Sequence, residues 1–140
     1  MRKGEVITLP KKLERIIYGG GNYQDAICEI LARIQDSELR FDIELILSEA
    51  ISNAYVHGNK MDVRKPIIIR CLFCSDAVKF QVQDCGVGFG DVVIPDEIAE
   101  EDLLAEKGRG LFLIKCFSDK VYMRENILFV TKKLVSKNDK

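Results

Sequence analysis

Residues 49–59 read EAISNAYVHGN, and this stretch decides how the rest of the chain is interpreted. Apolar residues recur with a helical period over Phe41–Val56, which predicts a long amphipathic helix. On a helical wheel, which advances about 100° per residue, Glu49, Asn53 and His57 fall along one shoulder of the apolar stripe. A carboxylate, an amide and the chain's single histidine would therefore face a groove beside the core.

The apolar stripe of this helix consists of Ile43, Ile46, Leu47, Ala50, Ile51 and Ala54. Gly58 follows the last periodic residue, and glycine commonly ends a helix because it tolerates left-handed backbone. We therefore expect Gly58 to be the C-terminal cap. Glutamate can act as a general base, and an asparagine oxygen can bind Mg²⁺. The alternative is that Glu49 and Asn53 are surface residues at helical spacing and that His57 is a capping residue.

Elsewhere in the chain, the spacing of the apolar residues differs from that of this helix. We expect strands over 5–9, 66–74, 78–83, 120–124 and 127–134, a helical turn or two over 11–18, and helices over 23–35 and 108–117. Ser75-Asp76 and Glu125-Asn126 would turn two hairpins, and the acidic segment 91–107 would be a long connection. With no repeat or linker in the sequence, residues 1–140 are expected to form one domain. Helices grouped before hairpins predict an α+β, two-layer sandwich of a mostly antiparallel mixed sheet with helices on one face.

Composition excludes several classes of function. The 21 basic and 22 acidic residues give a net charge of -1, which offers no case for direct nucleic-acid or membrane-surface binding. The sequence has neither an apolar run of about 20 residues nor a signal peptide, so we expect a cytoplasmic protein. Five cysteines suggest reduced thiols. Cys71 and Cys74 form a CxxC pair, but within a strand their side chains would point to opposite faces.

Two glycine-containing segments could form a binding site together with the helix. Asp84-Cys85-Gly86-Val87-Gly88-Phe89 follows a predicted strand, and its glycines would allow a backbone to approach a ligand closely. An aspartate there could accept a hydrogen bond from an amino group such as that of adenine. Gly108-Arg109-Gly110-Leu111 opens a predicted helix, whose N-terminus favours anions such as phosphates. Taken singly, a plain turn and a flexible loop end explain these segments as well.

Taken together and in this order, the three segments resemble the GHKL ATPase superfamily, which includes histidine-kinase ATP domains. EAISNAYVHGN is similar to the N box of that superfamily, DCGVGF to its first glycine box and GRGL to its second. The resemblance covers nearly the whole chain and implies a Bergerat-type ATP-binding fold. Within the superfamily, LSEAISNAYVHGN looks most like the bacterial anti-sigma-factor serine/threonine protein kinases.

The resemblance implies a role for each matching residue. Glu49 would be the general base that helps a protein serine attack ATP, and Asn53 would hold Mg²⁺ between the phosphates. Asp84 would bind the adenine amino group in a pocket shaped by Gly86 and Gly88. The other residues implied to contact the nucleotide are His57, Lys107, Gly108, Arg109, Gly110 and Leu111. Backbone amides at the two glycines of GRGL would meet the phosphates, and residues 91–107 would form an ATP lid.

The resemblance also implies partners. Kinases of this kind bind a sigma factor, phosphorylate an anti-anti-sigma protein of the STAS type, and commonly act as homodimers. One departure is that Glu125-Asn126-Ile127 stands where many members have a Gly-Thr pair, and another is that Glu106 precedes Lys107 at the second glycine box. Two alternatives are therefore a non-catalytic ATP-binding partner-switch module and a detached histidine-kinase-type ATP-binding domain.

Overall fold

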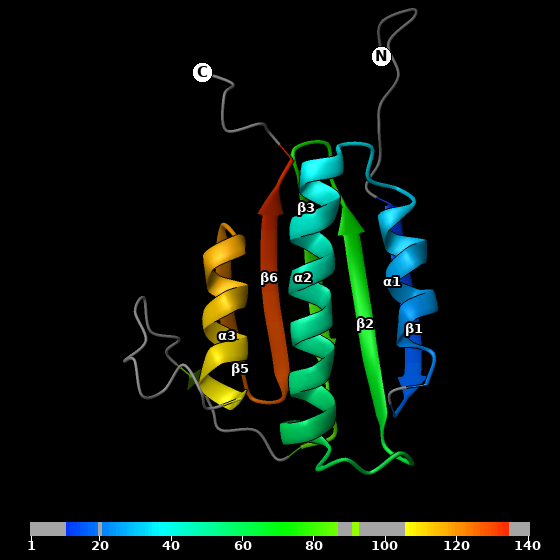
Figure 1. Cartoon of the computed structure of the whole chain (residues 1–140), viewed down its shortest axis with the longest axis vertical. Helices are drawn as coiled ribbons and strands as arrows, with labels where there is room; N and C mark the ends of the chain where they lie inside the picture. The colour runs from blue at the N-terminus through cyan, green and yellow to red at the C-terminus, as the bar shows by residue number, and fades with distance from the viewer. Residues whose placement is uncertain (1–10, 20, 87–90, 93–105, 135–140) are drawn as a thin grey trace, which may run out of the picture.

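The computed structural model describes residues 11–19, 21–86, 91–92 and 106–134. In these parts of the chain, three α-helices lie on one face of a six-stranded sheet (Figure 1). The strand order is β1-β2-β3-β6-β5-β4, and each neighbouring pair is antiparallel. The predicted α+β sandwich with its helices on one face is confirmed.

The elements have the following bounds. The strands are β1 (Lys11–Tyr18), β2 (Pro66–Phe73), β3 (Ala77–Gln83), β4 (Asp91–Val92), β5 (Lys120–Arg124) and β6 (Ile127–Lys133). The helices are α1 (Tyr23–Leu31), α2 (Ser37–Asn53) and α3 (Glu106–Phe117), and α2 continues into one turn of π-helix, η1 (Ala54–Gly58). Both predicted hairpins, β2–β3 and β5–β6, are confirmed.

The core lies between the sheet and the helices. All six apolar residues predicted for the central helix are buried, and Ile43, Ile46 and Leu47 are completely so. Each such side chain contributes about 1.5–3 kcal/mol when it is fully buried. This stripe fixes the rotation of α2 about its own axis, and hence the direction in which its polar shoulder points.

The prediction of a helical turn over residues 11–18 is wrong, because this segment is β1 and pairs with β2 along its whole length. Leu13 and Ile17 are buried, whereas Ile16 is 54% exposed. A separation of four residues puts two side chains on one face of a strand as well as of a helix, so the spacing did not distinguish them. The β-branched pair Ile16-Ile17 was the signal for a strand. The strand predicted over 5–9 lies outside the described residues.

Helix α2 starts earlier than predicted. The side chain of Asp36 accepts hydrogen bonds from the backbone N–H groups of Glu38 (2.9 Å) and Leu39 (3.0 Å), which is the geometry of a helix N-cap. Farther along α2, Asp42 forms an ion pair with Lys132 of β6 at 3.1 Å, and both side chains are largely buried. The helix is thus held to the sheet by a polar link as well as by apolar contacts.

The acidic connection over 91–107 contains regular structure at both of its ends. Asp91–Val92 forms the short edge strand β4, which pairs with β5. Helix α3 begins at Glu106, two residues before the predicted start. The predicted lid therefore overlaps two elements of regular structure at its ends, and its centre, residues 93–105, lies outside the described parts of the chain.

The cysteines take no part in a cross-link. All five are free, and burial raises the pKa of the Cys71 thiol to about 12. The described residues contain no cluster of three or more His, Cys, Asp or Glu side chains that could hold a metal ion. Within the same residues, every helix is too short or too polar to cross a bilayer.

Candidate functional site

A pocket of about 180 Å³ lies between α2 and α3. Its walls are formed by Ser48, Glu49, Ser52, Asn53, Val56, His57, Arg109 and Gly110. The three residues predicted to share one shoulder of the central helix therefore do face one cavity. Two residues of the predicted GRGL segment, Arg109 and Gly110, form the opposite wall. The lining is mainly polar, and it combines carboxylate, amide, imidazole and guanidinium groups.

The widened turn η1 continues this wall beyond the regular helix. The N–H of Asn59 donates to the carbonyl of Ala54 at 2.8 Å, which is a bond across five residues. Such π turns are rare and are frequent at functional sites. Asn53 is the last residue of the α-helical part, and His57 lies in the π turn. The π turn keeps His57 on the pocket even though the backbone no longer follows the α-helical period.

Helix α3 contains the whole of the predicted GRGL segment, within its first two turns. The N–H groups left unpaired at a helix start belong to its first turn, which here contains Gly108 but not Gly110. A β-carbon at Gly110 would lie 3.2 Å from Glu49 Oε2, so this glycine allows α3 to approach the carboxylate. Leu111 is in the hydrophobic core, so its side chain does not line the pocket. Lys107 belongs to α3, and its side chain is not described.

Asp84, the predicted adenine acceptor, lies just beyond the end of β3 and is 6% exposed. Its Oδ1 accepts the N–H of Gly86 at 2.7 Å. Burial raises the pKa of Asp84 above its ordinary value of 3.8, and the Gly86 hydrogen bond opposes this effect. A buried carboxylate with one hydrogen bond of this kind retains capacity to accept another from a ligand. Gly88 lies outside the described residues.

The role predicted for Gly58 is wrong. The left-handed residues after the helix are Lys60 (φ 55°) and Met61 (φ 61°), whereas the φ of Gly58 is in the ordinary range. Gly58 is needed instead for close approach, because a β-carbon there would lie 2.0 Å from Asp84 Oδ2. The end of the central helix is therefore in direct contact with the loop that follows β3, whose described residues are Asp84–Gly86 and which is called the aspartate loop below. This contact brings Asp84 next to the residue that follows His57 in the chain.

Two asparagines that the sequence analysis did not assign to the site hold the aspartate loop. Asn59 Oδ1 accepts the N–H of Cys85 at 2.7 Å. Asn126 Nδ2 donates to the carbonyl of Asp84 at 2.6 Å, and the N–H of Asp84 donates to the Asn126 carbonyl at 3.1 Å. The sequence HGN at residues 57–59, which resembles part of the N box, was the signal that could have assigned Asn59 to the site. For Asn126 the only signal was its departure from the Gly-Thr pattern.

Comparison with known protein families gives an independent result. The family described as "Histidine kinase-like ATPase domain" matches residues 23–132, which is most of the chain and includes the pocket, the aspartate loop and the last hairpin. The chain belongs to the histidine kinase-like ATPase domain family. The predicted superfamily is thereby confirmed.

Several relatives of this histidine kinase-like ATPase domain have names that indicate a narrower group. It is 33% identical to an anti-sigma F factor of Clostridium perfringens strain SM101 over 61% of the chain and 64% of the relative. It is 31% identical to an anti-sigma F factor of Oceanobacillus iheyensis over 57% and 56%, respectively. It is 29% identical to the serine-protein kinase RsbW of Listeria monocytogenes serotype 4a over 68% and 66%. The matched region thus spans less than two thirds of these relatives' own lengths.

Proposed function

We propose that the pocket between α2 and α3 binds Mg-ATP and that the protein transfers the terminal phosphate to a serine of a partner protein. The observation that carries this proposal is that Glu49 and Asn53 line the same pocket as Arg109 and Gly110. A base and an oxygen ligand from one helix thereby lie opposite a cation and the first turns of another helix. These are the groups that phosphoryl transfer needs, because positioning and charge neutralisation dominate its catalysis.

The donor set of the pocket suits a magnesium nucleotide. The Asn53 side chain offers a hard oxygen ligand, and Mg²⁺ usually takes only one or two protein ligands and keeps several waters. When bound, Mg²⁺ would neutralise charge on the phosphates. Arg109 and the N-terminus of α3 would attract the phosphates, and His57 would contact the nucleotide from the π turn. Lys107 and the backbone amide of Gly108 would act from the first turn of α3.

In the proposed reaction, the serine Oγ of the partner attacks the terminal phosphorus of ATP. The bond from that phosphorus to the bridging oxygen breaks, ADP leaves, and the serine proton moves to Glu49. Glu49 is half-buried beside Gly110, so its carboxylate lies directly against α3. Asp84 would accept a hydrogen bond from the adenine amino group, with Gly86 and Gly88 leaving room for the ring.

We further propose that the protein acts as an anti-sigma factor in the cytoplasm. It would bind a sigma factor, phosphorylate an anti-anti-sigma protein of the STAS type, and work as a homodimer. The names of the relatives support the first two points: some are anti-sigma F factors and others serine-protein kinases. The predicted homodimer, the absence of direct nucleic-acid binding and the lid over 91–107 stay predictions.

One observation favours a second function, a non-catalytic ATP-dependent partner switch. The side chain of Asn126, at the position of the expected Gly-Thr pair, is already hydrogen-bonded to the Asp84 carbonyl. An asparagine side chain has no hydroxyl, so this position lacks the group that the Gly-Thr pattern provides, and its amide is already used within the loop. In this reading, nucleotide binding would stabilise a docking surface without transfer of phosphate.

Phosphate transfer from ³²P-labelled ATP to a purified STAS-type antagonist separates the two functions. Glu49→Gln keeps the size of the side chain but accepts a proton poorly, so we expect transfer to slow by at least about a hundredfold. Binding of Mg-ATP, measured by calorimetry, should stay close to wild type. Glu44→Gln is the matched control, because Glu44 is an exposed acid on the same helix.

Two results would contradict the proposal. Equal transfer rates in Glu49→Gln and wild type would show that Glu49 is not the base. Failure of the wild-type protein to transfer phosphate to an antagonist that it binds in an ATP-dependent manner would favour the partner switch.

A further inference from the structure

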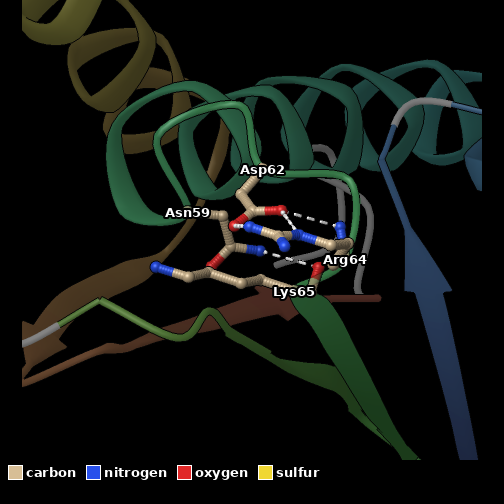
Figure 2. Close-up of polar contacts among 4 residues, drawn as sticks. All are labelled: Asn59, Asp62, Arg64 and Lys65. Carbon is tan, nitrogen blue, oxygen red and sulfur yellow. Dashed lines mark hydrogen bonds and ion pairs between the residues drawn. The ribbon is translucent and has the colours of Figure 1, made fainter.

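Asn59 is the one completely buried polar residue among the described parts of the chain. Its side chain uses both ends of the amide. Nδ2 donates to the carbonyls of Lys65 and Pro66, each at 3.2 Å, and Oδ1 accepts the N–H of Cys85 at 2.7 Å. Figure 2 shows the side chain reaching from the end of the helix toward Lys65. One buried amide thus joins the end of η1, the start of β2 and the loop after β3.

The segment between Asn59 and β2 holds the two acceptor carbonyls in place. Lys60 and Met61 are left-handed, and the chain then turns back so that the N–H of Lys65 donates to the carbonyl of Asp62 at 3.1 Å. The Asp62 carboxylate accepts from the backbone N–H of Arg64 and from its guanidinium (Figure 2). These bonds are local to the turn and do not involve the aspartate loop.

The contacts of Asn59 lie directly beside those of the proposed adenine acceptor. Gly58 is packed against the Asp84 carboxylate, and the next residue in each segment is joined by the hydrogen bond from Cys85 to Asn59. Two consecutive residues of the helix end are therefore paired with two consecutive residues of the loop. Asn126 holds the Asp84 backbone from the side of the sheet, and the Asn59 bond holds the loop from the side of the helix, where Gly58 is packed against the carboxylate.

We propose that Asn59 is a positioning residue for adenine recognition, which it controls through Asp84 without touching the nucleotide. This inference rests on the proposed function, since it assumes that the pocket binds ATP. A buried amide that satisfies three backbone groups is expensive to remove, because each orphaned group loses a hydrogen bond away from water. The consequence specific to positioning is a loss of selectivity for the 6-amino group of the purine.

The test compares the affinities of ATP and of purine riboside triphosphate, which lacks the 6-amino group, by calorimetry on the full chain with Mg²⁺. A site built to bond an amino group disfavours an analogue without it, so wild type should prefer ATP by about tenfold or more. In Asn59→Ala, the affinity for ATP should fall while that for the analogue changes little. The preference should then shrink to within about threefold. A substitution that only loosens the fold would weaken both nucleotides alike.

Asp62→Ala is the matched control, because it breaks bonds in the same turn but none to Cys85, and it should retain the preference for ATP. If Asn59→Ala does not fold, Asn59→Ser takes its place, and failure of both to fold would overturn the inference in favour of a purely structural role. Undiminished preference in a folded Asn59 variant, or equal loss in Asp62→Ala, would also overturn it. Wild type that binds both nucleotides equally would refute adenine reading by Asp84, and wild type that binds neither would refute the proposed function itself.

Discussion

Replacing Gly58 with alanine tests the contact between the central helix and the aspartate loop. The φ of Gly58 is one that any residue adopts, so alanine there causes no backbone strain. On propensity alone it would stabilise a helical position by up to about 1 kcal/mol. The new β-carbon, however, would lie 2.0 Å from Asp84 Oδ2 and 2.2 Å from Asp84 Cγ. The outcome depends on which of the two effects is larger.

The clash is the larger effect. Ordinary contact begins at 3.4 Å, so Gly58 and the carboxylate must separate by about 1.4 Å. The loop cannot move freely, because hydrogen bonds from Cys85 to Asn59 and from Asn126 to Asp84 hold it on both sides. Overpacking of this kind costs about 1–3 kcal/mol. We therefore expect Gly58→Ala to lower the free energy of unfolding by about 1–2 kcal/mol, and ATP affinity to fall by about tenfold because Asp84 is displaced.

Urea unfolding and ATP calorimetry measure the two effects, and Gly21→Ala is the control. A β-carbon at Gly21 meets no atom within 4 Å, so this variant should be as stable as wild type and bind ATP equally well. In an Asp84→Ala background the two closest atoms are gone, so the cost of Gly58→Ala should fall by more than half. A Gly58→Ala protein with wild-type stability and wild-type ATP affinity would refute the packing argument.

Two other predictions concern buried charges. Asp84→Asn should bind ATP about tenfold more weakly, yet it should be at least as stable as wild type at neutral pH, because folding raises the Asp84 pKa and so disfavours the ionised carboxylate. The stability difference between Asp84→Asn and wild type should vanish in acid, where Asp84 is protonated in both the folded and the unfolded state, and should grow as pH rises through and above 3.8. Urea titrations at several pH values check this. Asp42→Ala should lower the free energy of unfolding by about 3 kcal/mol, because it leaves the Lys132 ammonium buried without its partner, whereas Asp42→Leu with Lys132→Met should be close to neutral. Equal stability losses for the single and double variants would contradict this account.

The parts of the fold that the sequence predicted correctly are those where one periodic pattern had one interpretation. The buried stripe of α2 repeats over several turns, and both hairpins have alternating strands on either side of a two-residue turn. The prediction for residues 11–18 was wrong because the spacing of Leu13 and Ile17 fits the period of a strand as well as that of a helix. Only pairing with β2, which is distant in sequence, decides between them.

The candidate site was predictable to the extent that it follows from helix geometry. The four-residue spacing correctly predicted that Glu49, Asn53 and His57 share one pocket, but not that His57 reaches it from a π turn. The reason for Gly58 was not predictable, because a glycine after a helix has two explanations and the deciding atom, Asp84 Oδ2, is 26 residues away. The same holds for Asn59, whose three partners belong to other segments.

The central claim is that the pocket between α2 and α3 is a Mg-ATP site, and calorimetry of ATP with Mg²⁺ and with EDTA tests it most directly. We predict saturable binding of one ATP per chain that weakens when Mg²⁺ is removed. Asn53→Ala should bind ATP with the same affinity in either condition, whereas Ser52→Ala, which alters a neighbouring residue of the same pocket, should keep the magnesium dependence. An affinity for ATP that depends equally on Mg²⁺ in wild type and Asn53→Ala would contradict the account.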